Sequence, residues 1–236
     1  MRYLGFYIII ILAAIFVAFI FFPNLSFYRH HISYKQFKIY ADVEIDDAIY
    51  EILDKVEKQL KTSEIYDNDL SFKIFISSGF KPYSIFSPSY KDAFAVTYPI
   101  INNIFISKTD IKNNLVQRDA EEDYERSLTS VIEHEVTHKL IENEIGIKAN
   151  RKLETWKKEG YCEYVSGESK LNLKAGIKKV YKDSNSSSVA FSYLKYRILV
   201  TFLIDIKGHS FQSLVETEFD LKQLETELVN YSNNYY

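Results

Sequence analysis

Two different repeats of apolar side chains follow one another along the first half of the chain. Residues 37 to 43 alternate between apolar and polar, a period of two that predicts a strand. Residues 45 to 60 place an apolar side chain every three or four positions with charges between them, which is typical of an amphipathic helix. Residues 79 to 92 hold one Gly, two Pro and several Ser, which predicts a loop. Further strands are predicted at residues 70 to 77, 93 to 98 and 103 to 107, the last two as a hairpin.

The second half of the chain has helical periodicity almost throughout. Gly146 and Gly208 each follow a long predicted helix, at a position where glycine commonly ends one. The sequence therefore predicts an α+β fold, in which a small N-terminal mixed β-sheet with helices is followed by a helical C-terminal subdomain. The helices are predicted at residues 118 to 145, 153 to 165, 189 to 207, 210 to 216 and 219 to 230.

The N-terminus carries an uninterrupted apolar stretch. Residues 3 to 22 contain no charged side chain, and about 20 apolar residues, each rising about 1.5 Å, cross the ~30 Å core of a bilayer. The stretch runs directly into Pro23, without the small residues of a signal-peptide cleavage site. The sequence thus predicts an uncleaved transmembrane anchor at residues 1 to 23, a juxtamembrane connector at 24 to 35 and one domain at 36 to 236.

Charges around this stretch bear on which side of the membrane the domain faces. Basic residues follow it at Arg29, Lys35 and Lys38, against Arg2 before it, and a strict count places the domain in the cytoplasm. A very short N-terminal tail before a large domain is instead the layout of a signal anchor that exports its C-terminus. We expect a single-pass membrane protein with an extracytoplasmic domain.

Composition narrows the class of partner. Charged residues make up 26% of the chain and hydrophobic residues 47%, so it can bury a core. The formal net charge of -3 gives no basic excess, and we expect no nucleic acid among its partners. The single cysteine, Cys162, can form neither an intrachain disulfide nor a paired-cysteine metal site. It is predicted to be a small buried residue.

The candidate chemistry is concentrated at residues 134 to 138, which read HEVTH, an HExxH motif inside a predicted helix. Histidines four positions apart lie on one helix face, one turn apart, so both imidazoles can bind one metal ion. Glu135, between them, can lie beside the open position of the metal and accept a proton from bound water. The pattern predicts a metal site with His134 and His138 as ligands.

A catalytic zinc ion usually has three protein ligands and one water, so a third ligand is required. The longer pattern HExxHxxGxxH is excluded, because Ile141 and Glu144 stand where it requires Gly and His. Glu142 lies about 12 Å along the helix axis from His134, too far to share a metal easily. A carboxylate from a second helix has the better geometry.

Glu159 supplies that carboxylate on the next predicted helix. The loop after Gly146 can return the chain so that this helix crosses the first, and Gly160 leaves no side chain to hold the helices apart. Glu163 follows one turn later on the same face. Its carboxylate can accept the free ring N–H of a metal-bound histidine and so fix the tautomer of the ring.

Together with HEVTH, the segment WKKEGYCEYV at residues 156 to 165 resembles the gluzincin zinc peptidases, in particular the peptidase-MA-like group and the aminopeptidase branch with its NEGFAEY segment. The resemblance implies a zincin-like fold and one Zn²⁺ held by His134, His138 and Glu159, with Glu163 supporting a ligand. The chain has no GxMEN segment, which binds the substrate amino terminus in the aminopeptidase branch. The resemblance therefore does not extend to aminopeptidase specificity, and the sequence leaves the choice between endopeptidase and exopeptidase open.

The resemblance also implies a tyrosine on a later helix that helps to stabilise the oxyanion. Tyr193 is the predicted residue and Tyr196 the alternative. An edge strand at residues 103 to 107 is expected to pair with an extended peptide, and the loop at 79 to 92 to act as a lid or a plain surface loop.

These expectations together describe a membrane-anchored zinc metallopeptidase that cleaves peptide or protein substrates with Glu135 as general base. The alternative is an inactive zinc-binding scaffold on the same anchor. The retained Glu135 argues against this alternative, because binding zinc does not require it.

Overall fold

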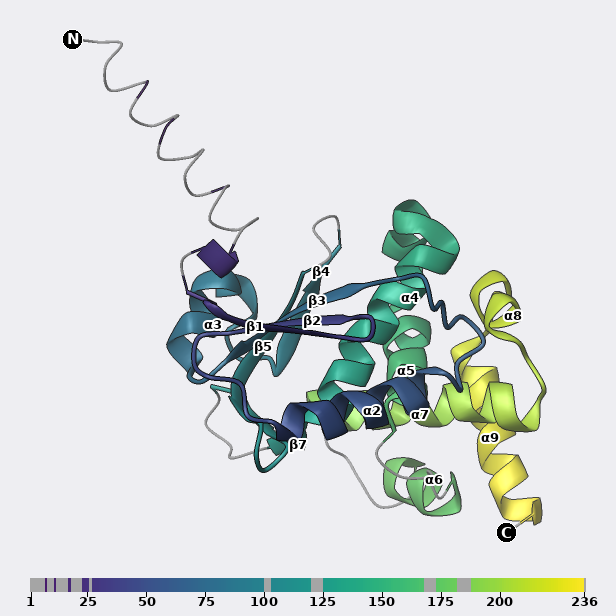
Figure 1. The fold of residues 1–236 in the computed structure, drawn as a ribbon. Helices are drawn as coiled ribbons and strands as arrows, with labels where there is room; N and C mark the ends of the chain where they lie inside the picture. Colours follow the sequence, from purple (N-terminus) through teal and green to yellow (C-terminus); the bar gives the residue numbers. More distant parts are fainter. Residues whose placement is uncertain are drawn as a thin grey trace. The chain divides into compact units, whose positions relative to one another are not determined.

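The structure is a computed structural model that describes residues 7, 11, 17, 23–25, 27–99, 103–119, 125–167, 173–181 and 188–235. The chain divides into two compact units, whose elements are labelled in Figure 1. Unit 1 comprises residues 1–54 and 68–131, and unit 2 comprises residues 55–67 and 132–236. The secondary structure is α+β, with the strands in unit 1 and most helices in unit 2.

Unit 1 is built on a mixed sheet. Its described strands are β1 (His30–Tyr34), β2 (Phe37–Ala41), β3 (Phe72–Ser77), β4 (Ala95–Tyr98), β5 (Asn103–Asp110), β6 (Leu115–Gln117) and β7 (Glu125–Ser127). They lie in the order β1-β2-β3-β5-β6-β7, and β4 pairs with β5. β2, β3 and β5 are parallel, and the other pairs are antiparallel. The register sets Ile39 beside Ile74 and Ile74 beside Ile104, all fully buried, so the alternation in the sequence becomes a continuous apolar face.

The prediction of a loop at residues 79 to 92 is wrong. Helix α3 (Phe80–Phe86) and the 3-10 helix η2 (Pro88–Tyr90) occupy this segment. Pro82 lies in the first turn of α3. Backbone N–H groups in the first turn have no acceptor within the helix, so proline, which lacks the N–H, is tolerated there. Tyr83 and Phe86, three positions apart, are both buried. The ring of Phe86 stacks on that of Phe105 in β5 at 5.4 Å, so the packing of aromatic side chains holds this helix in place.

Three further expectations for unit 1 are corrected. The segment predicted as an edge strand begins β5, which pairs with β3 on one side and β4 on the other. The predicted connector contributes β1 and the 3-10 helix η1 (Pro23–Leu25). The start of the helix predicted at residues 118 to 145 instead includes β7, and the helix begins at Leu128.

Unit 2 is helical in its described residues. Helix α2 (Ala48–Leu60) begins in unit 1 and ends in unit 2, as does α4 (Leu128–Lys152). Gly146 interrupts α4 with a φ of 78°, so glycine ends the first helical segment as predicted, and a second segment continues to Lys152. The other helices are α5 (Thr155–Val165), α6 (Leu173–Tyr181), α7 (Val189–Thr201), the π-helix η3 (Phe202–Ile206), α8 (Phe211–Glu216) and α9 (Leu221–Tyr235).

The predicted transmembrane helix, and with it the single-pass membrane localisation, is corrected by the structure. No helix among the described residues is both long and apolar enough to cross a bilayer. The 25-residue α4 has the necessary length, but charged side chains occur along it, whereas a bilayer core requires about 20 apolar residues in succession. Only residues 7, 11 and 17 of the predicted stretch at 3 to 22 are described, and the remainder of that prediction lies outside the described residues.

Candidate metal centre

The two histidines of the HExxH motif lie on one face of α4. Their ring centroids are 4.9 Å apart, and the ring planes are inclined by 77°. This arrangement follows from the helix, because residues four apart lie one above the other. The His134 side chain is 6% exposed and that of His138 is 18% exposed, so the pair lies at the edge of the core and remains reachable from solvent.

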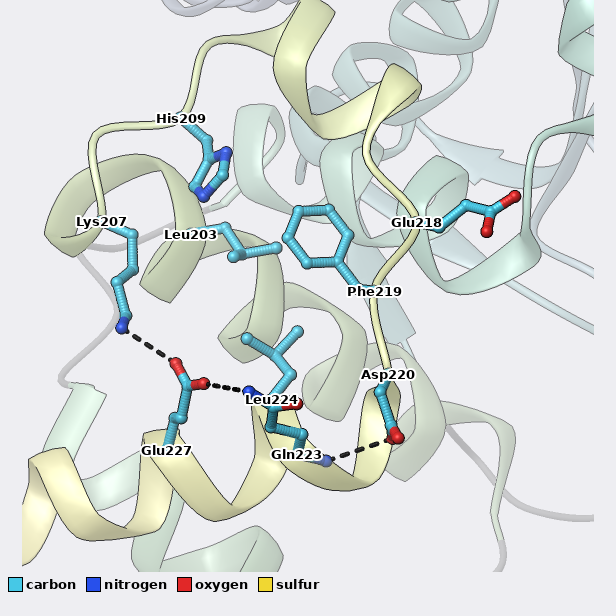
Figure 2. A pocket seen from close by; sticks show the side chains of 9 residues that line it. All are labelled: Leu203, Lys207, His209, Glu218, Phe219, Asp220, Gln223, Leu224 and Glu227. Atoms are coloured by element: carbon cyan, nitrogen blue, oxygen red, sulfur yellow. Dashed lines mark hydrogen bonds and ion pairs between the residues drawn. The ribbon is translucent and has the colours of Figure 1, made fainter.

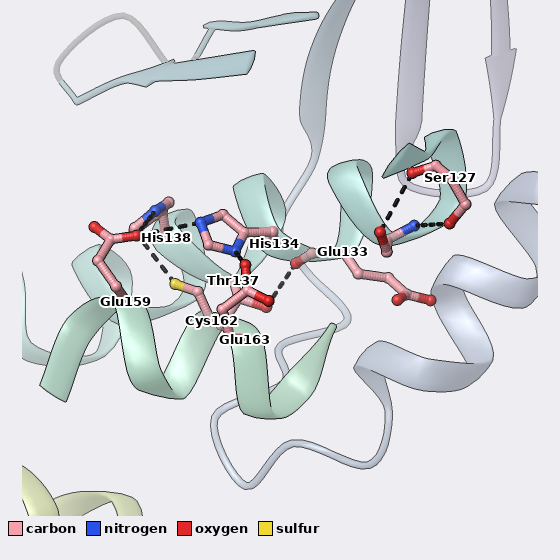
Figure 3. A network of polar contacts seen from close by, with 9 residues as sticks. Ser127, Glu133, His134, Thr137, His138, Glu159, Cys162 and Glu163 are labelled. Atoms are coloured by element: carbon pink, nitrogen blue, oxygen red, sulfur yellow. Dashed lines mark hydrogen bonds and ion pairs between the residues drawn. The ribbon is translucent and has the colours of Figure 1, made fainter. Parts of the chain in front are cut away.

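Glu159 on α5 meets both imidazoles with a single oxygen. Its Oε2 atom lies 3.3 Å from Nε2 of His134 and 3.4 Å from Nε2 of His138, and Figure 3 shows the carboxylate reaching the two rings. Ligand atoms about 2.1 Å from a tetrahedral zinc ion lie roughly 3.4 Å from one another. The spacing of the carboxylate oxygen from each imidazole nitrogen therefore fits the donor set of a metal ion with three protein ligands.

Helix α5 is fixed in unit 2 by polar contacts near both of its ends. Near its start, the buried Lys157 donates a 2.7 Å hydrogen bond to the carbonyl of Thr217. At its end, the carbonyl of Val165 accepts a 2.7 Å hydrogen bond from Gln59. These contacts limit rotation of the helix, and they therefore help to hold Glu159 toward the histidines.

The other nitrogen of each imidazole also has a partner on α5. Nδ1 of His134 lies 3.0 Å from Oε1 of Glu163. Nδ1 of His138 lies 3.3 Å from Sγ of Cys162. Glu159, Cys162 and Glu163 are three and four positions apart, so one face of α5 supplies the partners of both rings (Figure 3).

His134, His138 and Cys162 form a second possible ligand set, because each offers a donor atom within 4.8 Å of the others. The contacts favour Glu159 over the thiol as the third ligand. The Glu159 oxygen lies at Nε2 of both rings, whereas the sulfur contacts Nδ1 of His138, at the other edge of that ring. A metal ion between the two Nε2 atoms would use the carboxylate.

The electrostatics of the site favour a bound cation. Burial acts to lower the pKa of His134, but contacts with Glu159 and Glu163 outweigh it and raise that pKa to about 10. Burial acts to raise the pKa of Glu159, but the neighbouring His138 and His134 hold it well below its ordinary value. Glu159 is therefore an ionised carboxylate. A metal ion would have to displace the proton on His134 in order to bind there.

Glu135 and Cys162 are both buried near this charge cluster. Burial, followed by the carboxylates of Glu159, Glu135 and Glu163, raises the pKa of Cys162 well above its usual range, so the group is a neutral thiol. The Glu135 side chain contributes to the raised pKa of His134 as well. Its charge thus acts on the His134 imidazole and on the thiol, which places the predicted general base within electrostatic reach of the site.

Tyr193 on α7 lies over the site. Its ring is stacked on that of His134 with centroids 6.0 Å apart and planes 11° from parallel. Burial, and then the charges of Glu159, Glu135 and Glu163, raise the pKa of the Tyr193 hydroxyl, so it remains a neutral donor. Tyr196 lies one ring further away, 6.4 Å from Tyr193 between centroids. Of the two predicted tyrosines, Tyr193 is therefore the one whose ring contacts a histidine of the motif.

The role predicted for Gly160 is corrected. A Cβ atom at this position would lie 2.6 Å from Cγ2 of Val200 and 2.7 Å from the carbonyl oxygen of Tyr196, both on α7. The glycine therefore permits the close approach of α5 to α7, and not of α5 to α4 as the sequence suggested. Its position still serves the site, since α7 carries Tyr193.

Cys162 is the residue of the site that sequence reasoning missed. The prediction of a small buried residue is correct for its exposure, which is 0%. Its spacing, one helical turn from Glu159 and adjacent to Glu163, places it on the same face of the helix, but this spacing does not identify His138 as its partner.

A separate hollow of about 220 Å³ lies elsewhere in unit 2, near the start of α9 (Figure 2). Its polar lining is largely paired. Nδ1 of His209 contacts Oγ of Ser213 at 2.7 Å, and Lys207 forms a 2.9 Å ion pair with Glu227. Asp220 accepts hydrogen bonds from the first backbone N–H groups of α9. These contacts fix the turn before α9 and do not converge on a ligand position.

No protein-family model matches the chain, and no curated protein matches it.

Proposed function

We propose that the protein is a zinc-dependent peptidase that holds one Zn²⁺ with His134, His138 and Glu159. The observation that carries the proposal is the convergence of two imidazole Nε2 atoms on one carboxylate oxygen, at 3.3 and 3.4 Å. Two histidines and one glutamate form a donor set that catalytic zinc sites use, with the fourth position left to water or substrate. The resemblance of HEVTH and WKKEGYCEYV to the gluzincin peptidases supports the same reading.

Bound zinc would lower the pKa of a water molecule toward neutrality and polarise the carbonyl of a peptide bond. Glu135 is placed to act as the general base that would take a proton from the attacking water and pass it to the departing amine. The neutral hydroxyl of Tyr193 donates a hydrogen bond to the oxygen on which negative charge develops. Glu163 keeps His134 oriented through Nδ1. The substrate is a peptide or a protein.

The direct test is metal analysis of the purified full-length chain combined with digestion of a peptide library. We expect about one equivalent of zinc per chain and cleavage that a chelator abolishes and added zinc restores. Zinc content well below half an equivalent, or cleavage that persists in excess chelator, would contradict the proposal. Parallel samples loaded with Co²⁺ or Mn²⁺ show whether cleavage with these metals differs from cleavage with zinc at the same His₂Glu ligand set.

Glu135→Gln separates a peptidase from a zinc-binding scaffold. The substitution keeps the size of the side chain and removes the proton acceptor, so we expect zinc to be retained and cleavage to be lost. Glu144→Gln is the matched control, because Glu144 is an exposed residue on the same helix. Unchanged cleavage in Glu135→Gln would contradict the proposed mechanism, and zinc binding without cleavage in the wild type would favour a scaffold.

A further inference from the structure

The two imidazoles of the centre are supported by unlike groups. At their Nε2 edges both rings meet Oε2 of Glu159. At their Nδ1 edges His134 meets a carboxylate, Glu163, at 3.0 Å, whereas His138 meets the sulfur of Cys162 at 3.3 Å. Figure 3 shows the sulfur directed at the His138 ring from α5. The proposed function explains the carboxylate but assigns no role to the thiol.

The chemistry of imidazole determines which role Cys162 can have beside the His138 ring. A neutral ring has one N–H and one lone pair, and a ring that binds a metal through Nε2 carries its hydrogen on Nδ1. That N–H needs an acceptor, and outer partners of this kind fix the tautomer and the orientation of a metal-bound histidine. The sulfur of Cys162 is in hydrogen-bonding range of Nδ1 and is a weak acceptor.

We propose that Cys162 is a positioning residue of the metal centre, whose sulfur accepts the Nδ1–H of His138 and holds Nε2 of that ring toward Glu159. The inference rests on the proposed function, since it concerns the same centre. Cys162 is 0% exposed, so its sulfur is shielded from water. The sulfur remains outside the ligand set.

A thiol also suits the charge of its surroundings. Helix α5 already brings Glu159 and Glu163 to the rings, and Glu135 on α4 is buried with them. A third carboxylate from α5 would add a buried negative charge beside the three that are already present. A neutral acceptor supports His138 without that cost, so the type of residue at position 162 follows from the charges around it.

The test compares Cys162→Ala, Cys162→Ser and Tyr161→Phe in the full-length chain. Tyr161 is the buried neighbour of Cys162 on α5, and its hydroxyl contacts Ser63 at 3.0 Å instead of a histidine, so Tyr161→Phe is the matched control. Zinc affinity is measured by competition with a chelator. We expect Cys162→Ala to bind zinc about 10-fold more weakly, Cys162→Ser to recover most of the loss and Tyr161→Phe to match the wild type.

A second measurement uses the wild-type protein and does not depend on how the variants fold. Loaded with Co²⁺, it should show no sulfur-to-cobalt charge-transfer band, because the sulfur is not a ligand. Nitrogen NMR of His138 should report the hydrogen on Nδ1. A sulfur-to-cobalt charge-transfer band in the wild type, a His138 hydrogen on Nε2, or, in the first measurement, unchanged zinc affinity in Cys162→Ala would overturn the inference.

The failure of this inference is distinguishable from the failure of the proposed function. If the wild type binds zinc through His134 and Glu159 while Cys162→Ala binds it equally well, only the role of Cys162 is wrong. If the wild type binds no zinc, the proposed function is wrong and the inference fails with it.

Discussion

At the scale of single residues, each imidazole of the centre is held at both of its nitrogens. Glu159 faces Nε2 of both rings, and Glu163 and Cys162 face the two Nδ1 atoms. A ring held in this way cannot rotate without losing a partner, so the two Nε2 atoms stay directed at a common point. Such preorganisation would let a metal ion bind without first ordering its ligands.

The proton on His134 gives the metal-free protein a characteristic pH dependence. The pKa of this group is raised from 6.5 to about 10 on folding, so its contribution to stability is complete below pH 6.5 and is lost as the pH rises through 10. We expect the free energy of unfolding of chelator-treated protein, measured with urea, to fall over this interval more steeply in the wild type than in His134→Asn. Zinc affinity should rise over the same interval, because zinc displaces the proton. Identical pH profiles for the two proteins would show that the raised pKa is absent.

Tyr193 and Tyr196 are distinguished by which of them reaches the reacting atoms. Tyr193→Phe keeps the ring stacked on His134 and removes the hydroxyl, so we expect zinc content to be unchanged and kcat to fall about 100-fold. Tyr196→Phe is the matched control and should retain nearly all activity. Kinetics on a single peptide substrate, with zinc measured in the same samples, makes the comparison. A large loss of kcat in Tyr196→Phe but not in Tyr193→Phe would assign the stabilisation of the oxyanion to Tyr196 instead.

The residues of the centre were predictable from the sequence to different degrees. The pairing of His134 with His138 follows from helix geometry within one turn, and HExxH therefore identifies it directly. Glu159 required a second helix to return at the correct distance, which the loop length and the resemblance to gluzincins suggested. The contact of Cys162 depends on the rotation of α5 about its own axis, which no local pattern in the sequence determines.

At the scale of elements, the close packing of α5 against α7 brings together helices that carry opposite sides of the site. Gly160 makes this possible, because a Cβ atom there would lie 2.7 Å from a backbone oxygen that cannot rotate away. We expect Gly160→Ala to lower the free energy of unfolding by ~1–3 kcal/mol, as overpacking does, and to reduce cleavage by displacing Tyr193 relative to Glu159. Urea denaturation and peptide kinetics measure the two effects.

Gly79→Ala provides the control for Gly160→Ala. The nearest atom to a Cβ at Gly79 is Cδ of Pro82 at 4.0 Å, and the glycine has an extended backbone with a φ of -153°, so a methyl group fits. This variant should keep both its stability and its activity. If Gly160→Ala behaved like Gly79→Ala, α7 would be free to move away from α5, and the tight contact would not be what positions Tyr193.

Several elements were predicted close to their observed bounds, whereas α6, β6 and β7 were not predicted. α2, β2 and β3 lie within two or three residues of their predicted bounds. β6 and β7 have three residues each, too few to establish a period of two. The segment at 79 to 92 was misassigned because proline and serine resemble loop composition, whereas burial of Tyr83 and Phe86 decides for a helix. Tertiary packing overrode local propensity there.

At the scale of the whole molecule, every residue assigned to the metal centre belongs to unit 2. His134, Glu135 and His138 follow the division at residue 131, and α5 and α7 lie wholly beyond it. The sheet, which lies in unit 1, contributes no predicted ligand. Metal binding should therefore stabilise the two units unequally, because a ligand stabilises only the structure whose unfolding releases it.

Amide hydrogen exchange with and without zinc tests this unequal stabilisation. Free zinc at 100 times its dissociation constant stabilises the binding-competent state by about 2.7 kcal/mol, equivalent to about 100-fold slower exchange for amides exposed by its unfolding. We expect this slowing in α5, α7 and the part of α4 that follows residue 131, with little change in β2, β3 and β5. Glu159→Gln, which weakens the third ligand, should reduce the effect of zinc in the same helices. Equal slowing in the sheet and in these helices would mean that the two units unfold together, and the stabilisation by zinc would then belong to the whole chain.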